Sequence, residues 1–214
     1  MSAVRFDVLA IGSLSANAYW GEKTPVRREY ATAALVRSED VTLLVDPGWP
    51  AEVLRAALFY RAGLAPEAVT HVFLTHFDPA HFGGIDLFPE AAWSMFEEEI
   101  RYAEAEGDTD GLGGEVVRRA EAAPDSFAAG VDLFPTFGPS PGHCSLLVYT
   151  ALATAVVAGD IVPTREHFER GSLEDGPWDL AKARESFQDV LEIADLIVPG
   201  HDNLLVCRAG GGLV

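Results

Sequence analysis

The chain has 214 residues, of which 49% are hydrophobic and 22% charged, a composition typical of a globular protein with one large core. Its 33 acidic and 15 basic residues give a formal net charge of −18. No basic stripe interrupts this excess, so nucleic acid is excluded as an expected partner. No apolar run approaches the ~20 residues that cross a bilayer, and we expect no membrane association and a cytoplasmic location.

The first half of the chain predicts strands around one helix. Apolar, β-branched stretches at 4–12 and 69–75 indicate strands, and 31–48 predicts a hairpin. Helical periodicity covers 50–63, which begins near a proline and ends at a glycine. Residues 13–30, rich in polar and turn residues, predict a loop between the first strand and the hairpin.

The second half alternates helices with strands. Two helices are expected at 95–105 and 114–122, with the glycine-rich stretch 107–114 as a flexible connection. Later elements are a strand at 131–138, a hairpin of 145–150 and 153–159, an amphipathic helix at 177–194 and a strand at 195–202. No repeat or linker divides the chain, so we expect a single domain over residues 1–214, with two sheets covered by helices.

Both cysteines and four of the six histidines are informative. Cys144 and Cys207 are too few for a disulfide framework or a zinc–thiolate site, and free buried thiols are favoured over one disulfide. The four histidines lie in turns at strand ends, where a rigid scaffold can bring distant side chains together. They occur in "LTHFDPAHFGG" (His76 and His81), "SPGHCS" (His143) and "VPGHD" (His201).

Asp160, in "VVAGDIV", also ends a strand. Imidazole and carboxylate groups without cysteine are typical of catalytic sites for zinc, iron or manganese. Asp46, in "TLLVDPG", is expected either to hydrogen-bond near the floor of this site or to form the turn before Pro47.

In this order the motifs resemble the metallo-β-lactamase superfamily, which carries His-x-His-x-Asp-His and Gly-Gly, then Pro-Gly-His, Gly-Asp and Gly-His. The resemblance covers roughly residues 5–207. The run from "VVAGDIV" through "IADLIVPGHD" also resembles the subgroup of metallo-β-lactamase domain-containing proteins, which implies no particular substrate. The resemblance implies an α/β fold, an αββα sandwich of two mixed sheets packed face to face with helices on the outer faces.

The resemblance also implies a ligand set. His76 and His143 would help to hold one metal ion, His81 and His201 a second, and Asp160 would bridge the two. This sequence departs from the family pattern twice. Asp78 replaces the second histidine and still offers a ligand, whereas Ala80 replaces the family aspartate and offers none.

Three functions follow from this pattern. A hydrolase would use a metal-activated water on a small ester, thioester or lactone, with Asp78 and Asp160 as its catalytic carboxylates. A mononuclear non-heme iron dioxygenase of the persulfide dioxygenase type would use His76, His143 and Asp160, all of which are intact. A metal-binding scaffold without turnover is the third.

We expect one or two zinc ions, with iron and manganese as alternatives. A small-molecule substrate is expected as the partner, and a homodimer stays open.

Overall fold

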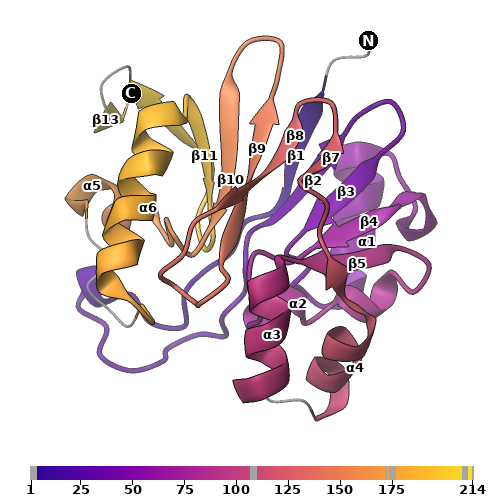
Figure 1. The fold of residues 1–214 in the computed structure, drawn as a ribbon, viewed down its shortest axis with the longest axis horizontal. Coiled ribbons are helices and arrows are strands. Elements are labelled where there is room, and N and C mark those ends of the chain that lie inside the picture. Colours follow the sequence, from indigo (N-terminus) through magenta and orange to yellow (C-terminus); the bar gives the residue numbers. More distant parts are fainter. Residues whose placement is uncertain (1–3, 107–109, 172, 174–176, 209–211, 214) are drawn as a thin grey trace.

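Two mixed β-sheets pack face to face in the described part of the chain, as the computed structural model shows (Figure 1). The structure describes residues 4–106, 110–171, 173, 177–208 and 212–213. The six-stranded sheet contains β1 (Arg5–Ala10), β2 (Ala33–Arg37), β3 (Thr42–Val45), β4 (His71–Phe73), β5 (Ala92–Met95) and β6 (Glu121–Ala122). The seven-stranded sheet contains β7 (Ser126–Ala128), β8 (Val131–Pro135), β9 (Cys144–Tyr149), β10 (Thr154–Gly159), β11 (Leu196–Pro199), β12 (Leu205–Arg208) and β13 (Gly212–Leu213).

Strand order follows chain order in both sheets. In the first sheet β1, β2 and β3 are antiparallel neighbours, and β3 to β6 run parallel. In the second sheet β10 and β11 are parallel and the other neighbours are antiparallel. Parallel strands end at the same edge of a sheet, so the residues that follow β3, β4, β10 and β11 gather along one edge of the sandwich.

The core between the sheets follows from the alternation of side chains along each strand. Val45 and Phe73 of the first sheet lie in one buried cluster with Leu146 and Val157 of the second. Cys144 belongs to this cluster too, which confirms that its side chain packs in the core. Cys144 and Cys207 are free, and Cys207 is only half-buried.

Helices cover the outer face of each sheet (Figure 1). On the first sheet α1 (Ala51–Ala57) continues as the π-helical turn η2 (Leu58–Ala62), and α4 (Gly111–Arg119) lies beyond it. On the second sheet lie α5 (Arg165–Arg170) and α6 (Leu180–Ile193), whose Phe168 and Phe187 pack against Val156 and Ile197. These layers confirm the αββα sandwich. The shorter helices are η1 (Ala18–Trp20), η3 (Pro66–Ala68), α2 (Pro79–Phe82) and η4 (Ile85–Leu87), and α3 spans Glu97–Glu106.

Most predicted helices and strands are confirmed, with small differences in where they begin and end. Three segments have a different structure from the one predicted. Residues 111–114 form the first turn of α4 rather than a flexible connection, and 107–109 lie outside the described residues. Residues 121–122, expected in a helix, form β6. Residues 165–170, for which no helix was predicted, form α5 and place His167 on it.

Tertiary packing accounts for these differences. Gly113, Gly114 and Val116 are buried, so close contact of α4 with the protein outweighs the low helix propensity of glycine. The short strand β5, which was not predicted, gains its pairing from β4 and β6. No described helix is both long enough and apolar enough to cross a membrane.

Candidate metal centre

The first motif is a turn that leaves β4 and enters α2. Asp78 caps α2, because its Oδ1 accepts a hydrogen bond of 2.7 Å from the Ala80 N–H, and Pro79 takes the first helical position. The turn places His76 before the helix and His81 on it, so both imidazoles reach the edge of the sandwich. Asp78 therefore has a structural task, and its role as a ligand stays a prediction.

Two glycines make room for side chains of the candidate site, Gly159 for His143 and Gly200 for Asp160. Gly159 has a φ of +55°, and a Cβ there would lie 2.8 Å from His143 Nε2. A Cβ on Gly200 would lie 2.2 Å from Asp160 Oδ1. Only glycine allows β10 and β11 to end this close to the ligands, which explains the "AGD" and "PGH" motifs.

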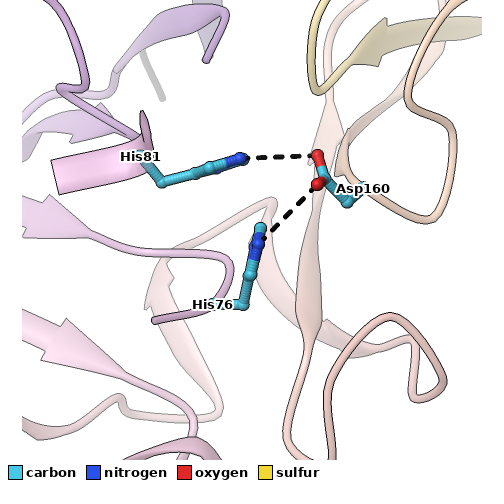
Figure 2. A group of neighbouring side chains, drawn as sticks. All are labelled: His76, His81 and Asp160. Atoms are coloured by element: carbon cyan, nitrogen blue, oxygen red, sulfur yellow. Dashed lines mark ion pairs between the residues drawn. The ribbon is translucent and has the colours of Figure 1, made fainter. Parts of the chain in front are cut away.

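Imidazole nitrogens surround both oxygens of Asp160 (Figure 2). His81 Nε2 lies 3.4 Å and His201 Nε2 3.2 Å from Oδ1, and His76 Nε2 lies 3.7 Å from Oδ2. Two atoms that bind the same tetrahedral ion through bonds of about 2.1 Å lie about 3.4 Å apart. These separations therefore fit Asp160 as a group shared between a His76 side and a His81/His201 side.

His143 also lies beside Asp160, but it contacts the backbone N–H of that residue rather than its carboxylate. Its Nε2 accepts a 3.1 Å hydrogen bond from the Asp160 N–H, so its proton lies on Nδ1, which donates to the Thr136 carbonyl at 3.0 Å. The rings of His143 and His76 lie 5.3 Å apart between centroids. The compact ligand group of the described residues contains His76, His81 and Asp160, and the assignment of His143 to the His76 ion stays a prediction.

Further contacts orient the second nitrogen of His81 and His201. Asp46 Oδ2 lies 3.0 Å from His81 Nδ1, and the Tyr30 carbonyl lies 2.9 Å from His201 Nδ1. Such contacts fix the ring orientation and leave Nε2 as the nitrogen that a metal ion would bind. Asp46 also accepts from the N–H and hydroxyl of Thr75, and its φ is +51°. Both expectations for Asp46 are thus confirmed, since it forms the turn and contacts Thr75 and His81 at the floor of the candidate site.

The pKa values of this group are strongly coupled through Asp160. Burial lowers the pKa of His81, but the carboxylates of Asp46 and Asp160 outweigh burial and hold it well above 6.5. Burial also lowers the pKa of His201, but the charge of Asp160 outweighs burial and raises that pKa above 6.5. Burial raises the pKa of Asp160, but His201 and His81 outweigh it and hold that pKa well below 3.8. The metal-free centre therefore holds protons that a bound cation would replace.

The other two histidines are neutral imidazoles. Burial, with the charge of His81, lowers the pKa of His76 below 6.5. Burial, with the charge of His76, lowers the pKa of His143 well below 6.5. Neutral imidazole is the form that binds a metal ion.

Two buried side-chain atoms that lack a hydrogen bond indicate whether a metal ion fits this site. Among the described residues, the buried side-chain polar atoms without a hydrogen-bond partner are Arg37 Nε, His81 Nε2 and Asp160 Oδ1. The last two face each other across 3.4 Å at the centre of the candidate site. An unpaired buried polar atom costs free energy, and a cation between these two would remove that cost. The histidines and carboxylates suit zinc, iron or manganese without selecting one.

A cavity of about 400 Å³ opens onto the centre. His76, Asp78 and Asp160 line it, together with residues of the loop 13–30. The opposite wall includes His167 of α5, whose Nδ1 lies 2.8 Å from the Thr164 hydroxyl. No sequence motif marks His167, and it was left out of the predicted site.

Glu99 is a second residue that sequence reasoning missed. It is fully buried on α3 and accepts hydrogen bonds from the Phe77 N–H (2.8 Å), the Ser140 hydroxyl (2.6 Å) and the Gly142 N–H (3.0 Å). It therefore joins the turn after His76 to the turn before His143. In the sequence it is one of three consecutive glutamates, and nothing distinguishes it from its exposed neighbours.

Fold and ligand set together define a metallo-β-lactamase-like protein. Residues 26–201 match the model of the family described as "Metallo-beta-lactamase superfamily", and the chain belongs to that superfamily. It is 36% identical over 188 residues to human metallo-beta-lactamase domain-containing protein 1, covering 80% of this chain and 62% of the relative. The chain thus spans less than two thirds of that relative's length.

Solved structures show the same fold. One is AidC, a dizinc quorum-quenching lactonase, with a TM-score of 0.70 and 15% identity, covering 98% of this chain and 90% of that one. Another is AiiA of B. thuringiensis with N-decanoyl-L-homoserine at its active site, with a TM-score of 0.69 and 20% identity over the whole of both chains. At these identities the likeness concerns the fold alone.

Proposed function

We propose that this protein is a metal-dependent hydrolase of a small, uncharged ester or lactone. The observation that carries the proposal is the arrangement around Asp160, where histidine nitrogens lie 3.2–3.7 Å from its two oxygens and two buried atoms lack a hydrogen bond. A bound metal ion supplies a water of lowered pKa and polarises a carbonyl. Similarity in fold to lactone hydrolases supports the reaction class.

In this proposal the candidate ligands form two groups, one for each metal ion. His76 and His143 serve one ion, His81 and His201 the other, and Asp160 lies between them. Asp78 lines the cavity beside His76, whose pKa stays lowered by burial although the charges of Asp160 and Asp78 oppose that effect. We assign Asp78 and Asp160 the handling of the attacking water: Asp78 as the carboxylate that accepts its proton, and Asp160 as the carboxylate that would hold the two ions on either side of it.

The wall of the cavity supports an uncharged substrate. The described acidic residues that line it are Glu29, Asp78 and Asp160, and the described lining holds no lysine or arginine. Bound ions would offset the carboxylates at the centre itself. Among the described lining residues, a phosphate or carboxylate on the substrate finds no lysine or arginine, whereas Leu14 and Leu173 offer apolar contact. This disfavours coenzyme A thioesters and glutathione persulfide.

One experiment tests the function against its alternatives. Protein expressed with metal supplementation is analysed for bound metals and assayed on N-hexanoyl-homoserine lactone, on acetyl-coenzyme A and, by oxygen consumption, on glutathione persulfide. We expect one to two zinc or manganese ions per chain and hydrolysis of the neutral lactone that a chelator abolishes and added metal restores.

Matched variants locate the activity. Asp160→Asn should lose it, whereas His71→Gln, which changes a histidine of β4 that pairs with Thr70, should keep it. Absence of any transition metal would contradict the proposal. Stoichiometric iron with oxygen consumption would establish the dioxygenase instead, and bound metal without turnover would establish the scaffold. The cytoplasmic location and the homodimer stay predictions.

A further inference from the structure

The loop 13–30 brings a carboxylate to the side of the centre that Ala80 leaves incomplete. In the family pattern an aspartate stands at position 80 and serves the ion of His81 and His201. Without it, that side keeps two imidazoles and the shared Asp160. The cavity on this side is lined by a further acidic residue, Glu29, which belongs to none of the four motifs.

Backbone hydrogen bonds fix the end of this loop against both His201 and Ala80. The Tyr30 carbonyl accepts from His201 Nδ1 at 2.9 Å, and the Ala31 N–H donates to the Ala80 carbonyl at 3.0 Å. The Thr32 N–H donates to the Gly200 carbonyl at 2.6 Å. The residue before this anchored segment is Glu29, so its backbone position is set by the same contacts that position the ligands.

The side chain of Glu29 points at the centre rather than at its basic neighbours. Its Oε1 lies 3.7 Å from His201 Nε2, and its Oε2 accepts a 2.7 Å hydrogen bond from the Ser15 hydroxyl. The adjacent Arg27 pairs with Glu22, and Arg28 lies over the ring of Tyr30. Among the described residues, the carboxylate is thus held in place by Ser15 and His201 and pairs with no arginine.

Three separations link these four groups in a chain, and each is compatible with a shared ion. His201 Nε2 lies 3.7 Å from Glu29 Oε1 and 3.2 Å from Asp160 Oδ1, and the latter lies 3.4 Å from His81 Nε2. Each value is close to the separation of about 3.4 Å expected for atoms bound to the same tetrahedral ion. His81 is fully buried, and its Nε2 lacks a hydrogen-bond partner, which independently indicates a ligand here.

We infer that Glu29 is the fourth protein ligand of the His81/His201 ion and replaces the carboxylate missing at residue 80. The inference rests on the metal centre of the proposed function, and it names a ligand that comes from another segment of the chain. The resulting set of two imidazoles and two carboxylates suits zinc or manganese. Position 80 can then be alanine without loss of the second ion.

The test measures metal binding rather than activity, so its outcome is independent of which substrate is hydrolysed. Wild-type protein, Glu29→Gln, Ala80→Asp and the double variant are titrated with zinc and with cobalt against a chelator, with elemental analysis of bound metal. Glu67→Gln, an exposed glutamate outside this cavity, is the matched control. Unfolding of each metal-free variant is recorded to verify that it folds.

We expect Glu29→Gln to bind one ion as the wild type does and to lose at least tenfold affinity for the other. Ala80→Asp should restore that affinity in the Glu29→Gln background and add little to the wild type, because both carboxylates serve one ion. Unchanged affinity in Glu29→Gln overturns the inference, and so does an equal effect of Ala80→Asp in both backgrounds. Loss of hydrolysis with unchanged metal binding would bear only on the proposed function.

Discussion

Replacing Glu99 by alanine should destabilise the protein and loosen the metal centre together. Glu99 is fully buried, and its two oxygens accept hydrogen bonds from Phe77, Ser140 and Gly142. The substitution leaves two buried donors and the half-buried Phe77 N–H without an acceptor, and each unsatisfied buried group costs about 1–3 kcal/mol. With partial relaxation we expect a loss of about 3–5 kcal/mol in the free energy of unfolding.

The assay is equilibrium unfolding by urea in the presence of a chelator, followed by metal titration of the folded protein. A loss of this size lowers the melting temperature by about 10 °C for a chain of this length. Because Phe77 follows His76 and Gly142 precedes His143, affinity for the ion on that side should fall about tenfold or more.

Glu98→Ala is the matched control, since Glu98 is exposed on the same helix turn and forms a 3.5 Å surface ion pair with Arg101. It should change stability by less than about 1 kcal/mol. The reasoning about Glu99 is refuted if Glu99→Ala unfolds within about 1 kcal/mol of the wild type and binds metal equally well.

Three further predictions concern the residues around the centre and the two thiols. Asparagine at position 46 can adopt the positive φ of Asp46 but is a weaker acceptor for His81 Nδ1. Asp46→Asn should therefore lower metal affinity about 10–100-fold in a chelator competition. An unchanged affinity would contradict the role of Asp46 in orienting His81. In metal-free protein the pKa of His81 is raised well above 6.5, so its contribution to stability is fully present below that pH and is lost as pH rises through the raised folded-state pKa. The stability difference between the wild type and His81→Gln, measured by urea unfolding with chelator, should therefore shrink as the pH rises above about 6.5 and through the raised pKa, and a constant difference would speak against it. Burial raises the pKa of the Cys144 thiol to about 12, so iodoacetamide at about pH 8 should modify Cys207 first and Cys144 only after unfolding, as peptide mass spectrometry would show; equal labelling of the folded protein would argue against a buried thiol.

The sequence by itself determined the elements whose signals are local. Alternating apolar residues and turn chemistry specified the hairpin of β2 and β3 and that of β9 and β10, and periodicity specified α6. The spacing of "LTHFDPAHFGG" and the glycines of "AGD" and "PGH" also located the ligand candidates, because a glycine is required where the backbone approaches a ligand closely, as at Gly159 and Gly200.

Only the tertiary structure decided the features that depend on partners distant in the chain. The strand β5 and the helix α4 have weak local signals and form because their neighbours in the fold pair with them and bury them. Glu99 and Glu29 look like any other glutamate in the sequence. Their importance arises from partners distant in the chain, such as Phe77, which lies 22 residues before Glu99, and His201, which lies near the other end of the chain from Glu29. The sequence gives the chemical type of each side chain, whereas burial and the path of the folded chain decide which groups that side chain contacts.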